Sequence, residues 1–306
     1  MKHFLDLGDW SSDSIQHIIY NAARMKAEWR NGGNPPLLRG QALAMVFQKP
    51  SLRTRVSFEI AMQHLGGNAI MLGPDEIGLG KRESIADVTR VLSGYTQAIM
   101  ARVFDHDHVT EMARWSRVPV INGLSDSHHP CQAIADLLTI YEHFSKLRGL
   151  RIVFVGDGNN VAASLGQAAA HMGAHFTLAA PAGYTLSEET LEQIATIGEP
   201  HGGTVEVYHD PAEAVRNADV IYTDTWVSMG QEADAARRIK DLTPYQINAA
   251  MLAIAPAHAV VMHCLPAHRG QEITDELADS DRSIIFQQAE NRLHAQKAIL
   301  VQLMVD

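Results

Sequence analysis

The sequence predicts an α/β fold of two doubly wound parallel-sheet domains joined by long helices. Its 306 residues are many for one hydrophobic core and suit two domains of about 150 residues each. Short apolar runs, typical of buried strands, alternate with amphipathic stretches, which is the pattern of parallel βαβ units. This alternation runs twice along the chain, with a break near residues 145–150. Two α/β domains account for both series.

The first series begins with an amphipathic helix expected over residues 13–30. Apolar side chains recur on one face of this helix at Ile15, Ile18, Ile19, Ala22 and Met25. Strands are then expected over residues 42–47, 69–72, 98–103 and 118–122. Helices are expected over residues 56–65, 84–93 and 132–141.

The second series opens with residues 151–156, an apolar run that ends in glycine. Further strands are expected over residues 175–179, 204–208, 220–223 and 259–263, and a final helix over residues 289–304. We therefore divide the chain into domains of residues 1–145 and 146–287. The C-terminal helix, residues 288–306, is expected to pack back on the first domain.

Charge and composition narrow the classes of function. The net charge of −10 argues against a general binder of nucleic acid or membrane surfaces, because both need a surplus of basic residues. A small anion can still bind where a few arginines converge. Two cysteines, Cys131 and Cys264, are too few for a disulfide framework and fit a reducing compartment. No targeting segment and no membrane-spanning apolar run is visible in the sequence, so we expect a cytoplasmic protein.

A polar loop after the first expected strand reads Ser51-Leu52-Arg53-Thr54-Arg55. A strand that feeds a helix through such a loop directs backbone N–H groups and the positive end of the helix dipole toward one place. Two hydroxyls and two guanidinium groups join them, and guanidinium forks match phosphate oxygens in pairs. We interpret the loop as a phosphate-binding site. The alternative is a solvated helix cap with the arginines in water, and the Gly-rich spacing of a P-loop is absent.

Six further segments follow this loop in order along nearly the whole chain. They read Met-Ala-Arg-Val at 100–103, Asn-Gly-Leu-Ser-Asp-Ser-His-His-Pro-Cys-Gln at 122–132, Gly-Asp-Gly-Asn-Asn at 156–160, Thr-Asp-Thr-Trp-Val-Ser-Met-Gly at 223–230, His-Cys-Leu-Pro at 263–266 and Glu-Asn-Arg at 290–292. With the loop, they resemble the aspartate/ornithine carbamoyltransferase family, whose phosphate loop usually reads Ser-Thr-Arg-Thr-Arg. The segments at 223–230 and 263–266 are similar to those of the ornithine branch.

The resemblance implies a reaction and two sets of binding residues. A carbamoyl group would pass from carbamoyl phosphate to the δ-amine of L-ornithine, giving L-citrulline and phosphate in arginine metabolism. The first domain would bind carbamoyl phosphate and the second ornithine. The carbamoyl phosphate contacts would be Ser51, Leu52, Arg53, Thr54, Arg102, His129, Gln132, Leu265 and Arg292. The ornithine contacts would be Asn160, Asp224, Ser228 and Met229, and the catalytic groups Arg102, His129, Cys264 and Arg292.

The chemistry of the reaction suits these residue types. A neutral δ-amine attacks the carbamoyl carbon, an oxyanion develops, and phosphate leaves. By the resemblance, Arg102, His129 and Arg292 surround the developing oxyanion, where one donor is worth roughly 3–4 kcal/mol. Gln132 and the Leu265 carbonyl would orient the carbamoyl amide. Proximity and electrostatics can carry such a transfer, so we expect no cofactor and no metal.

A dinucleotide site and a zinc site stay open as different classes of function. The turn at residues 156–161 half-matches a dinucleotide fingerprint but has Val161 in place of the third glycine. A zinc site has enough candidate ligands, although tight ligand pairs are missing. The candidates are His128, His129, Cys131, His263, Cys264 and His268.

Two of the expected site residues, and the acceptor itself, each allow a second interpretation. His129 could be a helix-start residue before Pro130, and Cys264 a buried small apolar side chain. Putrescine or an acylated ornithine could be the acceptor in place of free ornithine. Asp224 favours free ornithine, because an α-amino group needs a carboxylate partner.

Two positions depart from the family pattern. Leu52 replaces a threonine, so this position can bind an anion only through its backbone N–H. Gly78 stands where relatives often carry a polar side chain, in a loop that reaches a neighbouring active site in these trimeric enzymes. Lys81 or Arg82 could take over that contact, or could form a solvated basic turn. We expect a homotrimer or a multiple of trimers, and a catalytically silent relative remains the alternative.

Overall fold

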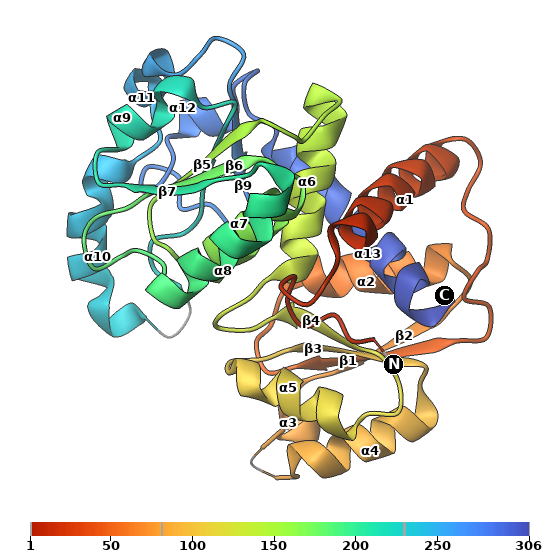
Figure 1. Ribbon diagram of the computed structural model, residues 1–306. Coiled ribbons are helices and arrows are strands. Elements are labelled where there is room, and N and C mark those ends of the chain that lie inside the picture. Colours follow the sequence, from red (N-terminus) through yellow and green to blue (C-terminus); the bar gives the residue numbers. More distant parts are fainter. Residues whose placement is uncertain (1, 81, 229–230, 306) are drawn as a thin grey trace. The chain divides into compact units, whose positions relative to one another are not determined.

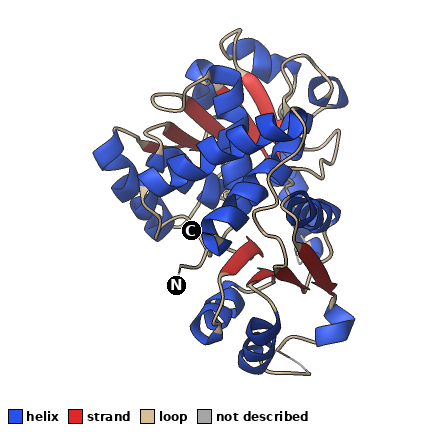
Figure 2. Ribbon diagram, turned by 90° about the vertical axis from the view of Figure 1, so that its right-hand side faces the viewer, coloured by secondary structure: helices blue, strands red, loops and turns tan. Residues whose placement is uncertain are grey.

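The computed structural model describes residues 2–80, 82–228 and 231–305. The backbone forms two compact units (Figure 1). Unit 1 comprises Met1–Leu138 and Glu290–Asp306, and unit 2 comprises Thr139–Ala289. In each unit the strands form one sheet among helices (Figure 2), and the predicted α/β class with two parallel-sheet domains is confirmed.

Unit 1 contains a four-stranded parallel sheet in the order β2-β1-β3-β4. Its strands are β1 (Ala42–Phe47), β2 (Asn68–Leu72), β3 (Ala98–Arg102) and β4 (Val120–Leu124). The chain goes from β1 to its neighbour on one side, β2, and then to its neighbour on the other side, β3. The winding direction therefore reverses between β1 and β3. In doubly wound sheets, ligands bind at the carboxyl ends of the strands at such a switch point.

The helices of unit 1 cover both faces of this sheet. They are α1 (Ser12–Arg30), α2 (Leu52–His64), α3 (Pro74–Ile77), α4 (Ile85–Tyr95) and α5 (His106–Trp115), with parts of α6 (Pro130–Phe144) and α13 (Ile285–Met304). Figure 1 shows α3, α4 and α5 on one face of the sheet and α1 and α2 on the other. Val88 of α4 and Met112 of α5 join an apolar cluster with Ile99 of the sheet, which explains why these strands are apolar throughout.

Unit 2 contains a five-stranded parallel sheet in the order β7-β6-β5-β8-β9. Its strands are β5 (Arg151–Val155), β6 (His175–Ala179), β7 (Val205–Tyr208), β8 (Val220–Thr223) and β9 (Val260–His263). Here the winding reverses between β5 and β8. Unit 2 thus has its own switch point, which lies between the expected Gly-rich turn after β5 and the expected ornithine residue that follows β8.

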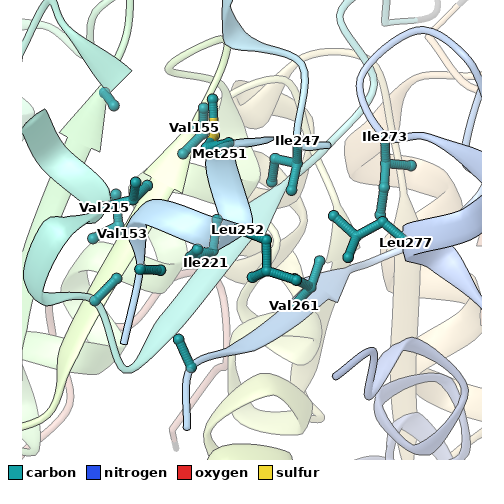
Figure 3. Close-up of a cluster of buried hydrophobic side chains, with 14 of the residues drawn as sticks. Val153, Val155, Val215, Ile221, Ile247, Met251, Leu252, Val261, Ile273 and Leu277 are labelled. Carbon is teal, nitrogen blue, oxygen red and sulfur yellow. The ribbon is translucent and has the colours of Figure 1, made fainter. Parts of the chain in front are cut away.

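Short helices and one apolar cluster complete unit 2. The α-helices are α7 (Asn160–His171), α8 (Glu188–Gly198), α9 (Pro211–Ala214), α10 (Ala235–Leu242), α11 (Ala249–Ile254) and α12 (Asp275–Ala278). The 3-10 helices are η1 (Glu199–His201), η2 (Val215–Asn217), η3 (Glu232–Asp234) and η4 (Thr243–Tyr245). Figure 3 shows Leu252 of α11 and Leu277 of α12 among side chains of the sheet, including Ile221 and Val261.

The predicted strands lie where the apolar runs indicated, and three have the predicted bounds, β1, β6 and β8. The helix predicted over residues 56–65 is wrong at its start, because α2 begins at Leu52. Ser51 caps the helix there, so the first turn can consist of polar residues without an apolar face. The strand predicted over residues 118–122 lies two residues later, at β4. None of the described helices combines the length and the apolar character that crossing a bilayer requires.

Candidate active site

Ser51 caps helix α2 just beyond the carboxyl end of β1. Its backbone is extended, with φ −159° and ψ 114°, and its Oγ accepts the Thr54 N–H at 3.3 Å. The Ser51 hydroxyl also donates to Thr54 Oγ1 at 3.1 Å. Because the first N–H groups of a helix have no partner inside the helix, this cap places donors and the positive dipole end at the switch point of unit 1. That is the geometry of an anion site.

Two buried arginines converge on Thr54 from distant parts of the sequence. Arg102, the last residue of β3, places Nη1 3.4 Å from Thr54 Oγ1. Arg292, on α13, places Nη2 3.3 Å from the same oxygen. Their exposed fractions are 8% and 3%, and that of Thr54 is 0%. Buried positive charges in one place are unfavourable without a counter-charge, so the cluster favours a doubly charged anion such as a phosphate group.

His129 and Gln132 stand at the start of helix α6 in the same unit. The His129 carbonyl accepts the Gln132 N–H at 3.0 Å, which fixes both residues in the first turn. The Gln132 side-chain oxygen accepts a hydrogen bond from Arg292 Nη1 at 2.7 Å. Arg292 thus bridges the first turn of α6 and the first turn of α2, and both of the helix-start residues predicted in the sequence lie in this cluster.

His129 is kept neutral by its surroundings. Burial, and then the positive charges of Arg292, Arg102 and Arg53, hold the pKa of His129 well below its usual value of 6.5. A neutral imidazole offers one donor and one acceptor, so it can polarise a carbonyl oxygen without adding a fourth positive charge. Arg53 lies in the first turn of α2, and its positive charge contributes least of the three arginines to lowering the pKa of His129.

The remaining loop residues lie on the outer side of α2. The Leu52 side chain is 74% exposed. Arg55 is half exposed, and its Nε lies 3.0 Å from Glu59 Oε1. The expectation of two loop guanidiniums at one place is therefore corrected for Arg55, which pairs with Glu59 one turn further along α2. Arg102 and Arg292 bring the additional guanidiniums instead.

We predict that Leu52→Thr changes the Kd for inorganic phosphate by no more than about threefold. The Leu52 side chain points to solvent, so a hydroxyl added there competes with water for the ligand, and one such bond contributes roughly 0.5–1.5 kcal/mol at most. Isothermal titration calorimetry measures the Kd. Val56→Thr, which adds the same hydroxyl at an exposed residue of the next turn, is the matched control. A tenfold change specific to Leu52→Thr would mean that this side chain turns toward the anion.

Asp224 organises the corresponding place in unit 2. It directly follows β8 and is 9% exposed. Its Oδ1 accepts the Cys264 thiol hydrogen at 3.0 Å, and its Oδ2 accepts the Asn159 side-chain amide at 2.8 Å. Cys264 follows β9 and Asn159 lies in the turn after β5. Each carboxylate oxygen keeps a further lone pair, so an ammonium group can bind to an acceptor that is already oriented.

Asn159, which was not among the predicted site residues, bonds Asp224 and directly precedes the predicted ornithine residue Asn160. Asn160 is the first residue of α7 and is half-buried. Ser228 is half-buried too, and its N–H donates to Gln231 Oε1 at 3.1 Å. Met229 lies outside the described residues. The structure thus brings Asp224 and Cys264 together. Asn160 directly follows Asn159, which bonds Asp224, and Ser228 lies four residues after Asp224.

A buried ion pair supports the segment after β8. Arg238 on α10 pairs with Asp157, and its Nε donates to the Trp226 carbonyl at 2.7 Å. Burial raises the pKa of Asp157 to about 6, while Arg238 opposes the rise and Asp224 adds to it. Arg238 therefore joins the turn after β5 to the segment that carries the expected ornithine residues.

Leu265 has an unusual backbone that a buried pair holds in place. Its φ is +58°, a left-handed conformation that costs a side-chain-bearing residue on the order of 1 kcal/mol. Its N–H donates to His263 Nδ1 at 2.9 Å, and His263 Nε2 donates to Glu272 Oε1 at 3.0 Å. His263 and Glu272 are both 0% exposed. The orientation of the Leu265 carbonyl is thus determined by neighbouring contacts.

Two domain profiles match most of the chain. Residues 2–142 match the aspartate/ornithine carbamoyltransferase carbamoyl-P binding domain. Residues 148–303 match the aspartate/ornithine carbamoyltransferase Asp/Orn binding domain. The chain belongs to the aspartate/ornithine carbamoyltransferase family.

Relatives within this carbamoyltransferase family match over nearly their whole length. The ornithine carbamoyltransferase of Anoxybacillus flavithermus is 50% identical over 303 residues, which are 99% of this chain and 96% of that protein. The anabolic ornithine carbamoyltransferase of Pyrococcus furiosus is 50% identical over 304 residues, with the same two shares. A solved structure of ornithine carbamoyltransferase from Pyrococcus furiosus has a TM-score of 0.97 at 49% identity, covering 99% of this chain and 97% of that one.

One group of described residues has metal-ligand types close together. The ligand atoms of Asp224, His263 and Cys264 lie within 4.8 Å of one another. Both ring nitrogens of His263, however, already bond Leu265 and Glu272, which leaves no lone pair for a cation. Cys131, another zinc candidate, donates to a backbone carbonyl, and burial raises its pKa to about 12. These bonds weigh against the zinc interpretation.

The glycine-rich turn after β5 packs against its own chain. The Gly158 N–H donates to the Tyr184 carbonyl at 2.7 Å. Asn159 Oδ1 accepts the N–H groups of Val161 and Ala162 at 3.0 and 3.1 Å. In a dinucleotide site, such N–H groups at a helix start hold the pyrophosphate. Because Asn159 already satisfies them, the turn orients Asp224 rather than a nucleotide.

Three residues that sequence reasoning missed, Asn159, Arg238 and Glu272, bond residues of the predicted motifs. Asn159 could have been found, since Asn before an apolar helical segment is a helix-cap signal. Arg238 and Glu272 carry no such signal. Arg238 lies 81 positions from its partner Asp157, and Glu272 lies nine positions from its partner His263. Neither spacing belongs to a known motif.

Proposed function

We propose that the chain transfers the carbamoyl group of carbamoyl phosphate to the δ-amine of L-ornithine, giving L-citrulline and phosphate in arginine biosynthesis. Membership of the carbamoyltransferase family and relatives at 50% identity named ornithine carbamoyltransferase support this reaction. The single structural observation that carries it is the convergence of Arg102 and Arg292 on Thr54, at the capped start of α2. This cluster fits the phosphate end of carbamoyl phosphate.

The residues of the unit 1 cluster contact different groups of carbamoyl phosphate in the proposal. Ser51, Arg53, Thr54 and the N–H of Leu52 bind the phosphate group. Arg102 reaches the phosphate and the carbamoyl carbonyl oxygen, His129 donates to the same carbonyl, and Arg292 adds positive charge beside it. The charge that develops on this oxygen during attack is thereby stabilised by groups that are in place before the reaction. The carbamoyl NH₂ group donates to Gln132 and to the Leu265 carbonyl.

The residues of unit 2 bind the acceptor in the proposal. Asp224 receives the α-ammonium of ornithine, because its two oxygens are oriented by Asn159 and Cys264. Asn160, Ser228 and Met229 would complete the contacts to the α-amino and carboxylate end. The Cys264 thiol would lie beside the δ-nitrogen. We accordingly assign carbamoyl phosphate binding to residues 1–145 with the C-terminal helix 288–306, and ornithine binding to residues 146–287.

An acceptor assay tests this function. The purified chain is given carbamoyl phosphate with ornithine or with putrescine, and the carbamoylated products are measured separately. We expect citrulline, and a kcat/KM for ornithine at least about a hundredfold above that for putrescine, because putrescine lacks the α-ammonium and carboxylate. Equal rates would reassign the acceptor, and no product with either amine would refute the transfer.

The rate is expected to depend on pH through the acceptor amine. An ammonium with a pKa of about 10.4 must lose its proton before the neutral amine can attack. The kcat/KM for ornithine should therefore rise about tenfold per pH unit from pH 6 toward 9. Burial and the charges of Arg292, Arg102 and Arg53 hold the pKa of His129 well below 6.5, so we expect the rise above pH 7 to follow the acceptor amine. A flat profile from pH 6 to 9, measured by citrulline formation, would contradict direct amine attack as the limiting step.

The assembly and the compartment also belong to the proposal. We propose a homotrimer or a multiple of trimers, supported by large apolar side chains exposed on unit 1, such as Tyr95 at 75% and Phe104 at 52%. Light scattering should then give three times the chain mass of 33.6 kDa or a multiple of that. Arg82 is exposed and available for a contact with a neighbour, and Lys81 lies outside the described residues. Two buried cysteines, neither of them in a disulfide, support a reducing, cytoplasmic location.

A further inference from the structure

A chain of hydrogen bonds leads from Asp136 to the phosphate loop inside unit 1. Gln132 Nε2 donates to Asp136 Oδ1 at 2.8 Å. Gln132 Oε1 accepts from Arg292 Nη1 at 2.7 Å, and Arg292 Nη2 in turn donates to Thr54 Oγ1 at 3.3 Å. Asp136 and Gln132 are 0% and 1% exposed. Asp136 thus bonds the amide nitrogen of Gln132, a residue of the proposed substrate site, while Arg292 bonds the amide oxygen of the same side chain.

The two partners of Gln132 determine which end of its amide faces Arg292. A guanidinium has N–H donors and no acceptor, whereas a carboxylate oxygen accepts. With the amide turned by half a rotation, its NH₂ group would face the donors of Arg292 and its oxygen would face the oxygen of Asp136. Buried polar groups without a suitable partner are costly. Asp136 and Arg292 therefore favour the same orientation, with the Gln132 oxygen toward Arg292.

We propose that Asp136 is a positioning residue that makes the site selective for a carbamoyl group. This inference rests on the proposed function, in which the Gln132 oxygen accepts from the carbamoyl NH₂ group. When the substrate binds Arg292, the bond from Arg292 no longer determines the orientation of the Gln132 amide by itself. The bond from the Gln132 amide nitrogen to Asp136 remains, so the amide oxygen stays directed at the NH₂ group of the ligand.

Acetyl phosphate is the probe that isolates this effect. It carries a methyl group where carbamoyl phosphate carries NH₂, and a methyl group donates no hydrogen bond to Gln132. The ratio of the two Kd values therefore measures the contribution of a correctly oriented Gln132 oxygen. A site that holds a donor of the substrate by a buried acceptor rejects an analogue that lacks the donor.

A purely structural role for Asp136 would have a different signature. Gln132 and Asp136 are four residues apart on α6, and such a pair also stabilises a helix, by roughly 0.2–0.5 kcal/mol. If that were its only role, substitution would lower the Tm and would weaken both ligands alike. The ratio of their Kd values would stay at the wild-type level.

The first variant is Asp136→Asn, which keeps the shape of the side chain but can present a donor as well as an acceptor. We expect the preference for carbamoyl over acetyl phosphate to fall about fivefold. Asp136→Ala should lower it about tenfold, equivalent to ~1.4 kcal/mol. Calorimetry on the full-length chain measures both Kd values. Should Asp136→Ala fail to fold, the isosteric Asn variant decides the question alone.

A double-mutant cycle shows whether Asp136 acts through Gln132. Gln132→Ala should itself remove most of the preference, and adding Asp136→Asn should then change the ratio by less than about twofold. Lys26→Met is the matched control, because Lys26 is a buried side chain of the same unit that bonds Asn291, next to Arg292. It should lower the Tm and leave the ratio unchanged.

The outcomes separate this inference from the function on which it rests. A wild-type chain that forms no citrulline would overturn the proposed function and the inference with it. A wild-type chain that forms citrulline but binds the two acyl phosphates equally would overturn the inference alone, and so would an Asp136→Asn variant that keeps the wild-type preference. An equal loss of preference in Lys26→Met would also overturn it, since any loosening of unit 1 would then suffice.

Discussion

Replacing Arg53 by alanine is expected to lower kcat/KM for carbamoyl phosphate by about a thousandfold or more. Arg53 lies in the first turn of α2 beside the Ser51 cap, and its charge acts on the buried ring of His129. A guanidinium in this place can form paired charge-assisted hydrogen bonds to a phosphate group. Such bonds contribute roughly 1.5–3 kcal/mol each, and the loss of two corresponds to about two to four powers of ten in rate.

Arg55→Ala is the matched control for Arg53→Ala. It removes the same charge from the same helix, but from a half-exposed side chain that pairs with Glu59. Its kcat/KM should stay within about twofold of the wild type, because exposed ion pairs contribute little. Both variants are compared by citrulline formation at saturating ornithine. The assignment of the phosphate site fails if Arg53→Ala keeps more than about a tenth of the wild-type rate.

Asp224→Asn is expected to have the second largest effect, a drop of about a hundredfold to a thousandfold in kcat/KM for ornithine. The α-ammonium of the acceptor would lose its charged partner. The new amide would also turn a donor toward Asn159 or Cys264, which both donate to Asp224 in the wild type. Losing a charge-assisted bond and misorienting a buried acceptor together account for about 3–4 kcal/mol.

The test of Asp224 depends on the contrast between the two substrates. The Kd for carbamoyl phosphate, measured without ornithine, should remain within about twofold, because Asp224 belongs to unit 2 and the phosphate cluster to unit 1. Asp241→Asn serves as the control, since Asp241 is an exposed carboxylate of unit 2 that accepts one bond from Tyr184. An ornithine kcat/KM unchanged in Asp224→Asn would remove Asp224 from the acceptor site.

Local patterns were sufficient to predict the strands and the phosphate loop. A parallel strand is buried on both faces, so β1 and β8 read as continuous apolar runs that end at polar residues. Ser51 to Thr54 could be interpreted because helix caps and anion sites draw on the same short list of residue types. Motifs compared across the family added Arg102 and Arg292, which local sequence alone would leave as ordinary basic residues.

Interactions between distant segments could not be predicted in the same way. Thr54 collects donors from residues 48 and 238 positions away, and no periodicity connects those positions. Short helices such as α9 and α12 lack the length that produces a clear helical period. The role of Asn159 has a similar cause. Its side chain bonds Asp224, 65 positions away, and sequence spacing does not record the direction in which a side chain points.

The split composition of unit 1 has a consequence for how the protein is made. The sheet, α2 and the phosphate loop belong to the first 138 residues, but Arg292 belongs to the segment Glu290–Asp306, which is synthesised after the whole of unit 2. At translation rates of about 5–20 residues per second, the nascent N-terminal part waits on the order of 10–30 s for its final helix. During this interval the ribosome extends the whole of unit 2. A nascent chain therefore exposes the apolar surface that α13 will cover until unit 2 has been synthesised, and only then does Arg292 join Arg102 at Thr54.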